Sequence, residues 1–265
     1  MQEKEMQIYK VAETRICTSG LSDFLSSIGT PEWTTDAASS TEKLIEVAGK
    51  LCYMSFDTKL NKNLTRVGMR NNEEYLQGGL IKTRHGSVLE HASVTFIFLN
   101  ISRVVTHELV RHRAGTAFSQ LSGRYVRAHE IEMSECPSII KDNTEAYGHY
   151  QAAIISAEQC MQKMVATFNL DECKDFDFKK KATSAIRRIV GNGQANHIMF
   201  TANMRALRHI IEMRTSAGAE EEIRKLFNKV FTICSKDYPA IFKDAIITED
   251  DDLQLFEVTF QHQKV

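Results

Sequence analysis

The chain has 265 residues, of which 43% are hydrophobic and 25% charged, and its formal net charge at pH 7 is −1. This composition is typical of one large folded domain, and the balanced charge argues against a general polyanion-binding surface, so neither nucleic acid nor a membrane is expected as a partner. No apolar run approaches the about 20 residues that cross a membrane, and the N-terminal segment lacks the apolar stretch of a signal peptide. We therefore expect a single domain over residues 1–265, located in the cytoplasm.

Six cysteines are scattered along the chain without a CxxC pair. In a reducing compartment this pattern is typical of free thiols rather than of a disulfide framework. The sequence alone leaves a single catalytic cysteine open, but no cysteine has a histidine or arginine at helical spacing that would activate a thiolate. We predict that none of the six is a nucleophile.

The N-terminal quarter is predicted to contain one strand and one helix. Weak alternation followed by glycine and proline predicts a strand and then loops within residues 1–35. Ser39 and Glu42 have the spacing of a capping box, so a helix is expected to begin there. The polar segment 57–72 is expected to be irregular. The apolar stripe expected on the helix consists of Leu44, Ile45, Val47, Ala48, Leu51 and Cys52.

The middle of the chain alternates between strand and helix signals. Residues 93–99 are rich in β-branched and aromatic side chains and predict a strand, and residues 102–113 predict a helix. The small and hydroxyl residues of 114–123 predict a loop. Helical periodicity then predicts a long helix over 144–167 and another over about 179–190.

Two further helices are expected near the C-terminus, over residues 196–213 and 219–235. Helices therefore dominate, and a small sheet must include residues 94–99. The sequence predicts a helix-rich α/β fold of the α+β kind, in which a small sheet is flanked by long helices. The apolar stripe of the last helix is Ile223, Leu226, Phe227, Val230 and Phe231.

The segment THELVRHR, residues 106–113, superficially resembles a zinc-protease motif. That motif requires histidines four residues apart, whereas His107 and His112 are five apart and would lie about 140° apart around a helix, so no metal is expected here. Glu108 shares a helical face with Arg111 and with His112, and a surface ion pair is the simplest interpretation of this motif alone.

The density of basic residues nevertheless favours a ligand site. Arginine forks bind phosphates with paired hydrogen bonds, and loop amides complete such a cradle. Five basic residues lie within seventeen positions around the small-residue loop, namely Arg111, His112, Arg113, Arg124 and Arg127.

The segment 120–125, QLSGRY, offers polar groups without a hydrolase pattern. Ser122 has no local general base, which argues against a serine hydrolase. The amide of Gln120 can read the edge of a pyrimidine or a flavin. Gly123 either lets the backbone approach a ligand or serves as a plain turn glycine.

The segment 203–214, NMRALRHIIEMR, combines a buried helical face with polar residues. Arg205 and His209 are one turn apart, and Asn203 returns to nearly the same face as Arg214. An arginine on a buried face requires a partner, so Arg214 either meets a ligand or pairs with an acidic residue within 220–222. Either arginine of the pair 187–188 alone would more often be a surface residue.

Together these segments resemble the flavin-dependent (ThyX-type) thymidylate synthases. The signature of that family is Arg-His-Arg, seven residues, and then Ser-x-Arg-Tyr, which residues 111–113 and 122–125 fit. The segments THELVRHR, LEHAS and NMRALRHIIEMR also look like family sequence, and they occur in family order between about residues 83 and 224.

The resemblance implies a ThyX-type fold, bound FAD, and a homotetramer whose active sites are shared between subunits. Arg214 corresponds to the arginine that polarises the pyrimidine, and it is the implied catalytic residue. The implied flavin contacts are His91, Ser93, Arg111, His112, Arg113, Gln120, Asn203, Arg205 and His209. The implied nucleotide contacts are Glu108, Arg111, Gln120, Leu121, Ser122, Gly123, Arg124, Arg187 and Arg214. A lone His91, without the resemblance, would be interpreted as a hydrogen-bonded core or loop histidine.

The implied reaction is C5 methylation of dUMP to dTMP, with 5,10-methylene-tetrahydrofolate as the carbon donor and NADPH-reduced FAD as the hydride source. One alternative is a related flavin and folate enzyme that acts on UMP or makes a hydroxymethyl pyrimidine nucleotide. Another, from a different class, is a nucleotide- or RNA-binding protein that uses the arginines for phosphates without catalysis.

Two positions depart from the family pattern. Eight residues separate Arg113 from Ser122 instead of seven, and Val190-Gly191 stands where many members have Leu-Pro. We expect the extra residue to form a solvent-facing bulge within 114–119, with dUMP as the preferred substrate. The second departure is expected only to loosen a helix end.

Overall fold

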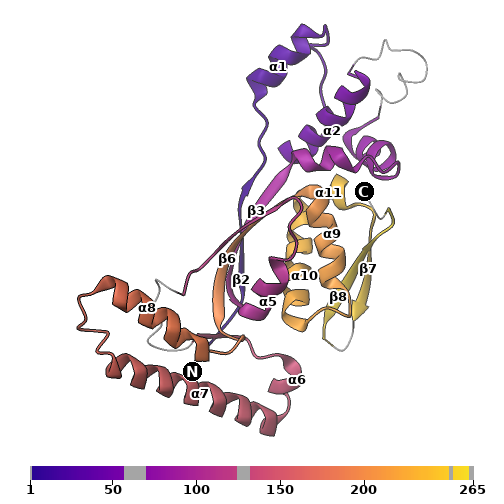
Figure 1. Cartoon of the computed structure of the whole chain (residues 1–265). Helices are drawn as coiled ribbons and strands as arrows, with labels where there is room; N and C mark the ends of the chain where they lie inside the picture. Colours follow the sequence, from indigo (N-terminus) through magenta and orange to yellow (C-terminus); the bar gives the residue numbers. More distant parts are fainter. Residues whose placement is uncertain (1, 57–69, 124–131, 251–252, 263–265) are drawn as a thin grey trace. The chain divides into compact units, whose positions relative to one another are not determined.

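The computed structural model describes residues 2–56, 70–123, 132–250 and 253–262. Helices and small sheets are mixed, which confirms the predicted helix-rich α/β class (Figure 1). No helix in these ranges is long and apolar enough to cross a membrane. The chain divides into two compact units: unit 1 is residues 1–9, 97–112 and 118–200, and unit 2 is residues 10–96, 113–117 and 201–265.

A four-stranded sheet contains strands that each begin in one unit and end in the other. On β3, Val94, Phe96 and Phe98 are fully buried at alternate positions, as the pleat of a strand requires. The strand predicted at residues 93–99 is confirmed and extends three residues further. In sheet order the strands are β2 (Gln7–Glu13), β3 (Ser93–Ser102), β6 (Ala195–Asn203) and β4 (Thr116–Gln120).

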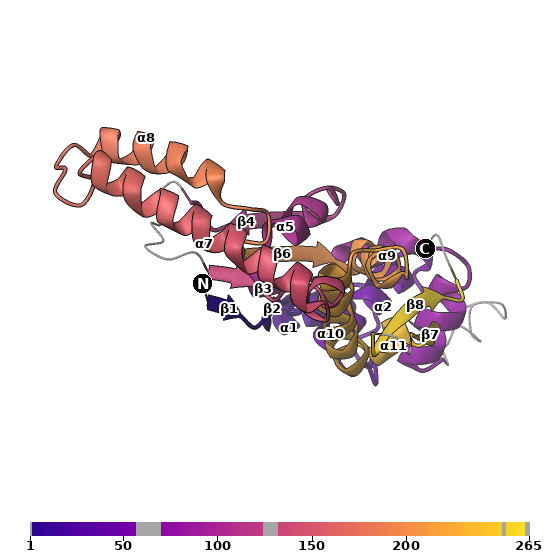
Figure 2. The same cartoon turned by 90° about the horizontal axis from the view of Figure 1, so that it is seen from below.

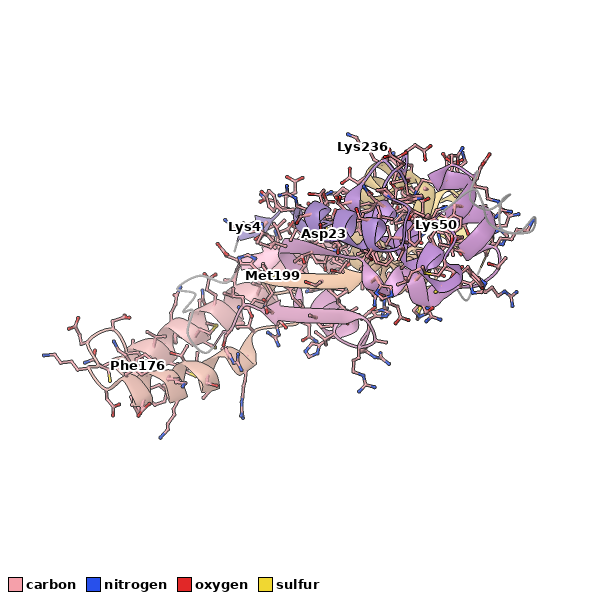
Figure 3. The ribbon with its side chains drawn as sticks, turned by 90° about the horizontal axis from the view of Figure 1, so that it is seen from above. Lys4, Asp23, Lys50, Phe176, Met199 and Lys236 are labelled. Atoms are coloured by element: carbon pink, nitrogen blue, oxygen red, sulfur yellow. The ribbon has the colours of Figure 1, made fainter. Side chains whose placement is uncertain are left out.

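Unit 1 contains a long helical hairpin, α7 and α8, whose helices run side by side (Figure 2). Asn143 caps α7 by accepting from the Ala146 N–H at 3.0 Å, and α7 has the predicted bounds. At the far end of the hairpin, Phe176 is 66% exposed (Figure 3). The helices are α5 (Arg103–Leu109), α6 (Ser138–Lys141), α7 (Thr144–Thr167), α8 (Phe176–Ile186) and the 3-10 turn η3 (Arg187–Ile189). A short parallel pair joins β1 (Gln2–Lys4) to β5 (Glu132–Ser134).

Unit 2 holds most of the buried core, where α9 packs against α10 and β8. The stripe predicted for α10 is entirely buried, which confirms the helix expected there. The helices are α1 (Thr18–Ser27), α2 (Ser40–Tyr53), α4 (Asn72–Glu74), the π-helix η1 (Tyr75–Ile81), the 3-10 helix η2 (Gly86–His91), α9 (Met204–Thr215), α10 (Glu221–Asp237) and α11 (Pro239–Phe242). An antiparallel hairpin is formed by β7 (Ala245–Asp250) and β8 (Leu255–Phe260).

Most of the buried face of α2 is polar, contrary to the predicted apolar stripe, of which Ile45 is the member that is fully buried. The start of the helix is as expected, since Ser39 Oγ accepts from the Glu42 N–H at 3.1 Å. Leu51, however, is 49% exposed, whereas Glu46 and Lys50 are buried with 3.5 Å between the carboxylate and ammonium groups. The Lys50 ammonium also lies 4.6 Å from the centre of the Tyr75 ring, and Figure 3 shows this lysine among the helices of unit 2. Apolar periodicity fails here because a satisfied polar network occupies the inner face.

Three predicted boundaries were wrong, and sheet pairing explains two of them. The helix expected over 102–113 ends at Leu109. Residues 116–120 of the expected loop form β4, and residues 196–203 of an expected helix belong to β6. These segments become strands because they pair with each other, and such tertiary pairing overrides local propensity. The loops expected after β2 instead include the helix α1. Leu25 is the only buried residue of α1, so its sequence shows almost no apolar periodicity from which a helix could be predicted.

The buried arginine of α9 is Arg208 rather than Arg214. Arg208 donates to both carboxylate oxygens of Asp244, at 2.8 and 3.0 Å, and to the Ile241 carbonyl at 2.5 Å. Its guanidinium also lies 3.9 Å from the centre of the Phe260 ring. This arginine therefore joins α9 to the segment that follows α11 and to β8.

We predict that Arg208→Ala strongly destabilises the protein, because the buried Asp244 carboxylate loses its partner. Removing one partner of a buried ion pair costs about 3–5 kcal/mol, measurable as the free energy of unfolding in denaturant. The control is Lys243→Ala, which breaks an exposed 3.1 Å pair with Glu73 and should cost less than about 1 kcal/mol. Equal, small losses in both variants would contradict the structural role of Arg208.

Candidate active site

The end of β6 meets the start of α9 at Asn203, which both closes the strand and caps the helix. Asn203 Oδ1 accepts from the Ala206 N–H at 2.8 Å. The Asn203 N–H donates to the Gly115 carbonyl at 2.9 Å, and the Met204 N–H donates to the Ala92 carbonyl at 2.9 Å. These bonds hold the residues before β3 and β4 against the end of β6. We call Ala92, Gly115, Asn203 and Met204 the Asn203 junction.

Gly115 is required at this junction for two reasons. Its φ is +71°, and a Cβ atom would lie 2.5 Å from Asn203 Nδ2. Because β4 begins at Thr116, only residues 114 and 115 of the range 114–119 precede the strand, and both are exposed. The solvent-facing bulge expected within this range stays a prediction. Deleting Gly115 would shift β4 by one residue and turn each of its side chains to the opposite face.

The first two turns of α9 present Arg205 and His209, both exposed. Arg205 Nη1 lies 2.5 Å from Glu90 Oε1, which orients the guanidinium. Glu90 precedes His91, the exposed last residue of η2. The LEHAS segment contained the signal for this pair, but the sequence interpretation assigned no role to Glu90.

Unit 2 holds three other predicted site residues, Ser93, Arg113 and Arg214. The Ser93 N–H donates to Thr14 Oγ1 at 2.9 Å, and its carbonyl accepts from the Thr14 N–H at 3.0 Å, which fixes the start of β3. Arg214 is half-buried in the last turn of α9, on the same helix that Asn203 caps. Arg113 is exposed and also belongs to unit 2.

In unit 1, the arginine-histidine segment begins in the turn that ends α5. The Arg111 N–H donates to the Glu108 carbonyl at 3.4 Å, and the His112 N–H donates to the Leu109 carbonyl at 3.1 Å. His112 is therefore not helical, and the predicted sharing of a helical face with Glu108 is wrong. The angle of about 140° between His107 and His112, which assumed that both lie on one helix, does not apply either. Among the described residues, no group of three His, Cys, Asp or Glu side chains is placed to hold a metal ion.

The end of β4 carries the second half of the signature. Gln120 Nε2 donates to Thr106 Oγ1 at 3.3 Å, and the Leu121 N–H donates to the His197 carbonyl at 2.9 Å. A Cβ atom on Gly123 would lie 3.1 Å from Nη1 of Arg187, so the missing side chain leaves room for that guanidinium. The structure thus brings together Gly123 and Arg187, which are 64 positions apart in the sequence.

Leu121, Gly123 and Arg187 line a cavity of about 730 Å³ within unit 1. Sequence reasoning missed most of the other polar residues of its wall, because they come from separate segments without a shared motif. These residues include Arg103, His107, Arg188, Asn192, Asn196 and His197. Ser122 is half-buried beside this segment, and Arg124 and Arg127 lie outside the described residues.

The cysteines differ widely in environment. Burial raises the pKa of Cys234 well above its usual range, and Cys136 is also buried. At the exposed Cys17, a hydrogen bond with Ser19, 3.4 Å between Sγ and Oγ, lowers the thiol pKa. That none of the cysteines is a nucleophile stays a prediction.

Comparisons with known proteins identify the family of the chain. A family model described as thymidylate synthase complementing protein, Thy1, matches residues 35–240. The flavin-dependent thymidylate synthase of Mycobacterium tuberculosis is 36% identical over 245 residues, covering 90% of this chain and 92% of that protein. The enzyme of the same name from Mycobacterium avium is 34% identical over 238 residues, covering 89% and 91%.

Two solved structures share the fold. ThyX from Helicobacter pylori, solved with FAD and dUMP, has a TM-score of 0.56 at 18% identity, covering 90% of this chain and 98% of that one. The UMP/dUMP methylase PolB from Streptomyces cacaoi, bound with 5-Br dUMP, has a TM-score of 0.63 at 15% identity, covering 92% and 96%. These likenesses define the fold as the ThyX-type α/β fold. The chain belongs to the Thy1 family, the flavin-dependent thymidylate synthases.

The residues of unit 2 fit a flavin cofactor. FAD combines a diphosphate with a flat ring whose edge donates and accepts hydrogen bonds. The side chains around the Asn203 junction supply an amide, a guanidinium and an imidazole, from Asn203, Arg205 and His209. The glycine at position 115 leaves the Asn203 amide the space that a Cβ atom would fill.

We predict that Gly115→Ala lowers FAD affinity by at least about tenfold, equivalent to about 1.4 kcal/mol, because the new Cβ displaces the Asn203 amide. Absorbance of bound flavin per protein and a dialysis titration measure the change. Gly29→Ala is the matched control, since Gly29 has φ +75° but no atom within 4 Å of an added Cβ. Unchanged flavin binding in folded Gly115→Ala protein would remove Asn203 from the flavin site.

Gly123→Ala should raise the KM for dUMP by about fivefold to tenfold. The added Cβ would displace the Arg187 guanidinium by a few tenths of an ångström. Because a misplacement of about 1 Å can cost on the order of 10²-fold in rate, this smaller displacement should have a smaller effect. Steady-state kinetics with dUMP varied measure the effect. Gly191→Ala adds a methyl group where nothing lies within 4 Å and should change nothing. The same KM in all three proteins would exclude Arg187 from nucleotide binding.

Proposed function

We propose that this chain methylates C5 of dUMP to form dTMP, with FAD as its bound cofactor, 5,10-methylene-tetrahydrofolate as the carbon donor and NADPH as the reductant. Membership of the flavin-dependent thymidylate synthase family supports the reaction. The observation that carries the proposal is the Asn203 junction, because its hydrogen bonds fix residues 92, 115 and 203 of three distant signature segments. A protein that only bound phosphates would need arginines. It would not need an amide such as that of Asn203, which is held by a helix-capping bond and has its space kept open by Gly115.

The proposed flavin residues in unit 2 hold and orient the cofactor. Arg205, already aligned by Glu90, offers donors to a phosphate or ring oxygen, and His209 lies one helical turn further. Asn203 is fixed by its capping bond and presents its amide nitrogen. When bound, FAD supplies the hydride chemistry that no side chain of the chain can perform. His91, Ser93, Arg111, His112, Arg113 and Gln120 complete the proposed flavin set.

The proposed nucleotide residues bind the phosphate and the base. The Arg187 guanidinium, which fits over Gly123, is suited to a phosphate by its planar fork. Gln120 can pair with the pyrimidine edge through its amide. Glu108, Arg111, Leu121, Ser122 and Arg124 complete the proposed set together with Arg214.

Arg214 is the proposed catalytic residue. An arginine guanidinium is a permanent cation in proteins, so Arg214 can stabilise negative charge that develops on the pyrimidine ring as C5 becomes nucleophilic. This role is electrostatic and transfers no proton. The one-carbon unit then replaces the C5 hydrogen, which leaves as a proton. NADPH supplies the two electrons, so the folate product is tetrahydrofolate.

The assembly and location remain proposals. We propose a homotetramer in which several subunits complete each active site. Its support is the apolar surface of the described helices: Ile154 is the only buried residue of α7, while Ile139 is 84% and Phe176 66% exposed. Light scattering after gel filtration tests the tetramer. A single functional domain over residues 1–265 and a cytoplasmic location are proposed from the sequence.

The reaction is tested by incubating the FAD-loaded protein with methylene-tetrahydrofolate, NADPH and either dUMP or UMP. Mass spectrometry should show a gain of one methyl group on dUMP and a slower reaction of UMP. Faster methylation of UMP, or a hydroxymethyl product, would replace the proposed substrate or product. The absence of any nucleotide product with flavin bound would refute the reaction itself.

Arg214→Ala should keep its FAD but lose on the order of 10²–10³ in the rate of dTMP formation, the usual effect of removing one preorganised charge contact. Flavin content and single-turnover kinetics measure the two properties separately. Arg214→Lys should recover only part of the rate, because a point charge does not reproduce a planar fork. Near-normal turnover in either variant would make Arg214 a structural residue.

A further inference from the structure

The cavity of unit 1 is larger than its proposed nucleotide residues account for. Of the residues that line its about 730 Å³, only Leu121, Gly123 and Arg187 belong to the nucleotide set. The rest of the wall comes from α5, from β5, from the α7–α8 hairpin, and from the stretch between η3 and the start of β6. Volumes of 300–1,000 Å³ are typical of sites for small organic ligands, so the space suits a second ligand group beside a nucleotide phosphate.

One wall of this cavity is apolar. Met161 and Val165 of α7 line it together with Leu170 and Ile186. These four side chains also belong to the core of the helical hairpin, where Leu170 is 1% and Ile186 4% exposed. The wall is therefore fixed by packing, and it offers an apolar surface to a flat hydrophobic group.

Positive charge on the cavity wall comes from Arg103 at the start of α5 and from Arg188 in η3. In the part of the chain that the structure describes, neither arginine has a carboxylate within ion-pair distance. Two acidic residues also line the cavity, but Lys4 already lies 3.4 Å from the Glu132 carboxylate, and Asp171 has interactions of its own. With Arg187, the wall carries three guanidinium groups against these two acids.

His197 adds a neutral donor to the same wall. Its Nδ1 accepts a hydrogen bond from the Asn100 N–H at 3.2 Å, so the ring carries its proton on Nε2. Asn100 has a φ of +61°, in the left-handed region where asparagine is among the tolerated residues. The tautomer of His197 is thus set by the backbone at the end of β3.

We propose that this cavity binds the aminobenzoyl-glutamate end of the folate co-substrate, and this inference rests on the proposed function. An aryl ring packs against Met161 and Val165, and the two glutamate carboxylates pair with Arg103 and Arg188. A phosphate alone would make no use of the apolar wall. Two guanidinium groups on different elements match a ligand with two separate carboxylates.

The test compares folic acid with pteroic acid, which has the same rings but lacks the glutamate. Calorimetry is performed on the FAD-loaded protein with dUMP bound, so it requires no turnover. Wild-type protein should bind folic acid at least about tenfold more tightly than pteroic acid, since charge-assisted hydrogen bonds contribute about 1.5–3 kcal/mol each. Arg103→Gln and Arg188→Gln should each reduce that preference several-fold.

Lys181→Gln is the matched control, because it removes one positive charge from an exposed position of α8 that does not line the cavity. It should keep the full preference for folic acid. In kinetics, the two arginine variants should raise the KM for methylene-tetrahydrofolate while the KM for dUMP and the flavin content stay within about twofold of wild type.

An unchanged preference in both arginine variants would overturn the assignment, as would wild-type protein that does not bind folic acid. A raised KM for dUMP with unaltered folic acid binding would assign the cavity to the nucleotide instead. If the wild type forms no dTMP but binds folic acid through Arg103 and Arg188, the proposed reaction fails and the cavity assignment stands.

Discussion

The Asn203 junction is the constraint on which the proposed flavin site depends. Asn203 ends β6, caps α9 with its side-chain oxygen, and donates its backbone N–H to the Gly115 carbonyl. Met204 ties the same point to Ala92, immediately before β3. Since the order of the sheet is β2-β3-β6-β4, the junction lies where its three adjacent strands β3, β6 and β4 meet the loops and helices that carry the signature. A site held on strand ends and a helix start keeps its geometry better than one on free loops.

Arg208 secures the other end of this arrangement within unit 2. Its paired hydrogen bonds to Asp244 hold α9 to the chain that enters β7, and α9 in turn carries Arg205, His209 and Arg214. The stability of the helix and the orientation of the proposed site residues therefore share one scaffold. The same helix carries one buried arginine that stabilises the fold and two further arginines, Arg205 and Arg214, that we propose for ligand binding, which is why the sequence pattern did not separate them.

The sequence predicted elements whose own periodicity is strong, such as α7 and α10, and the signature segments that identify the family. It failed where partners distant in the chain decide the outcome. Residues 116–120 became a strand through pairing with β6, and the inner face of α2 accepted Glu46 and Lys50 through a polar network. The cavity of unit 1 was likewise invisible in sequence, because its walls come from several separate segments between Arg103 and His197. For the proposed site residues, the motif predicted the positions, whereas hydrogen-bond partners such as Glu90 required the structure.

The most direct test of the account is a single turnover followed by visible absorbance and product analysis without oxygen. Protein with bound FAD is first reduced by one equivalent of NADPH, and dUMP and methylene-tetrahydrofolate are then added alone or together. The account predicts that the absorbance of oxidised flavin returns only when both are present, with about one dTMP formed per FAD re-oxidised and tetrahydrofolate as the folate product. The formation of dTMP without re-oxidation of the flavin, or a protein that binds no FAD at all, would contradict it.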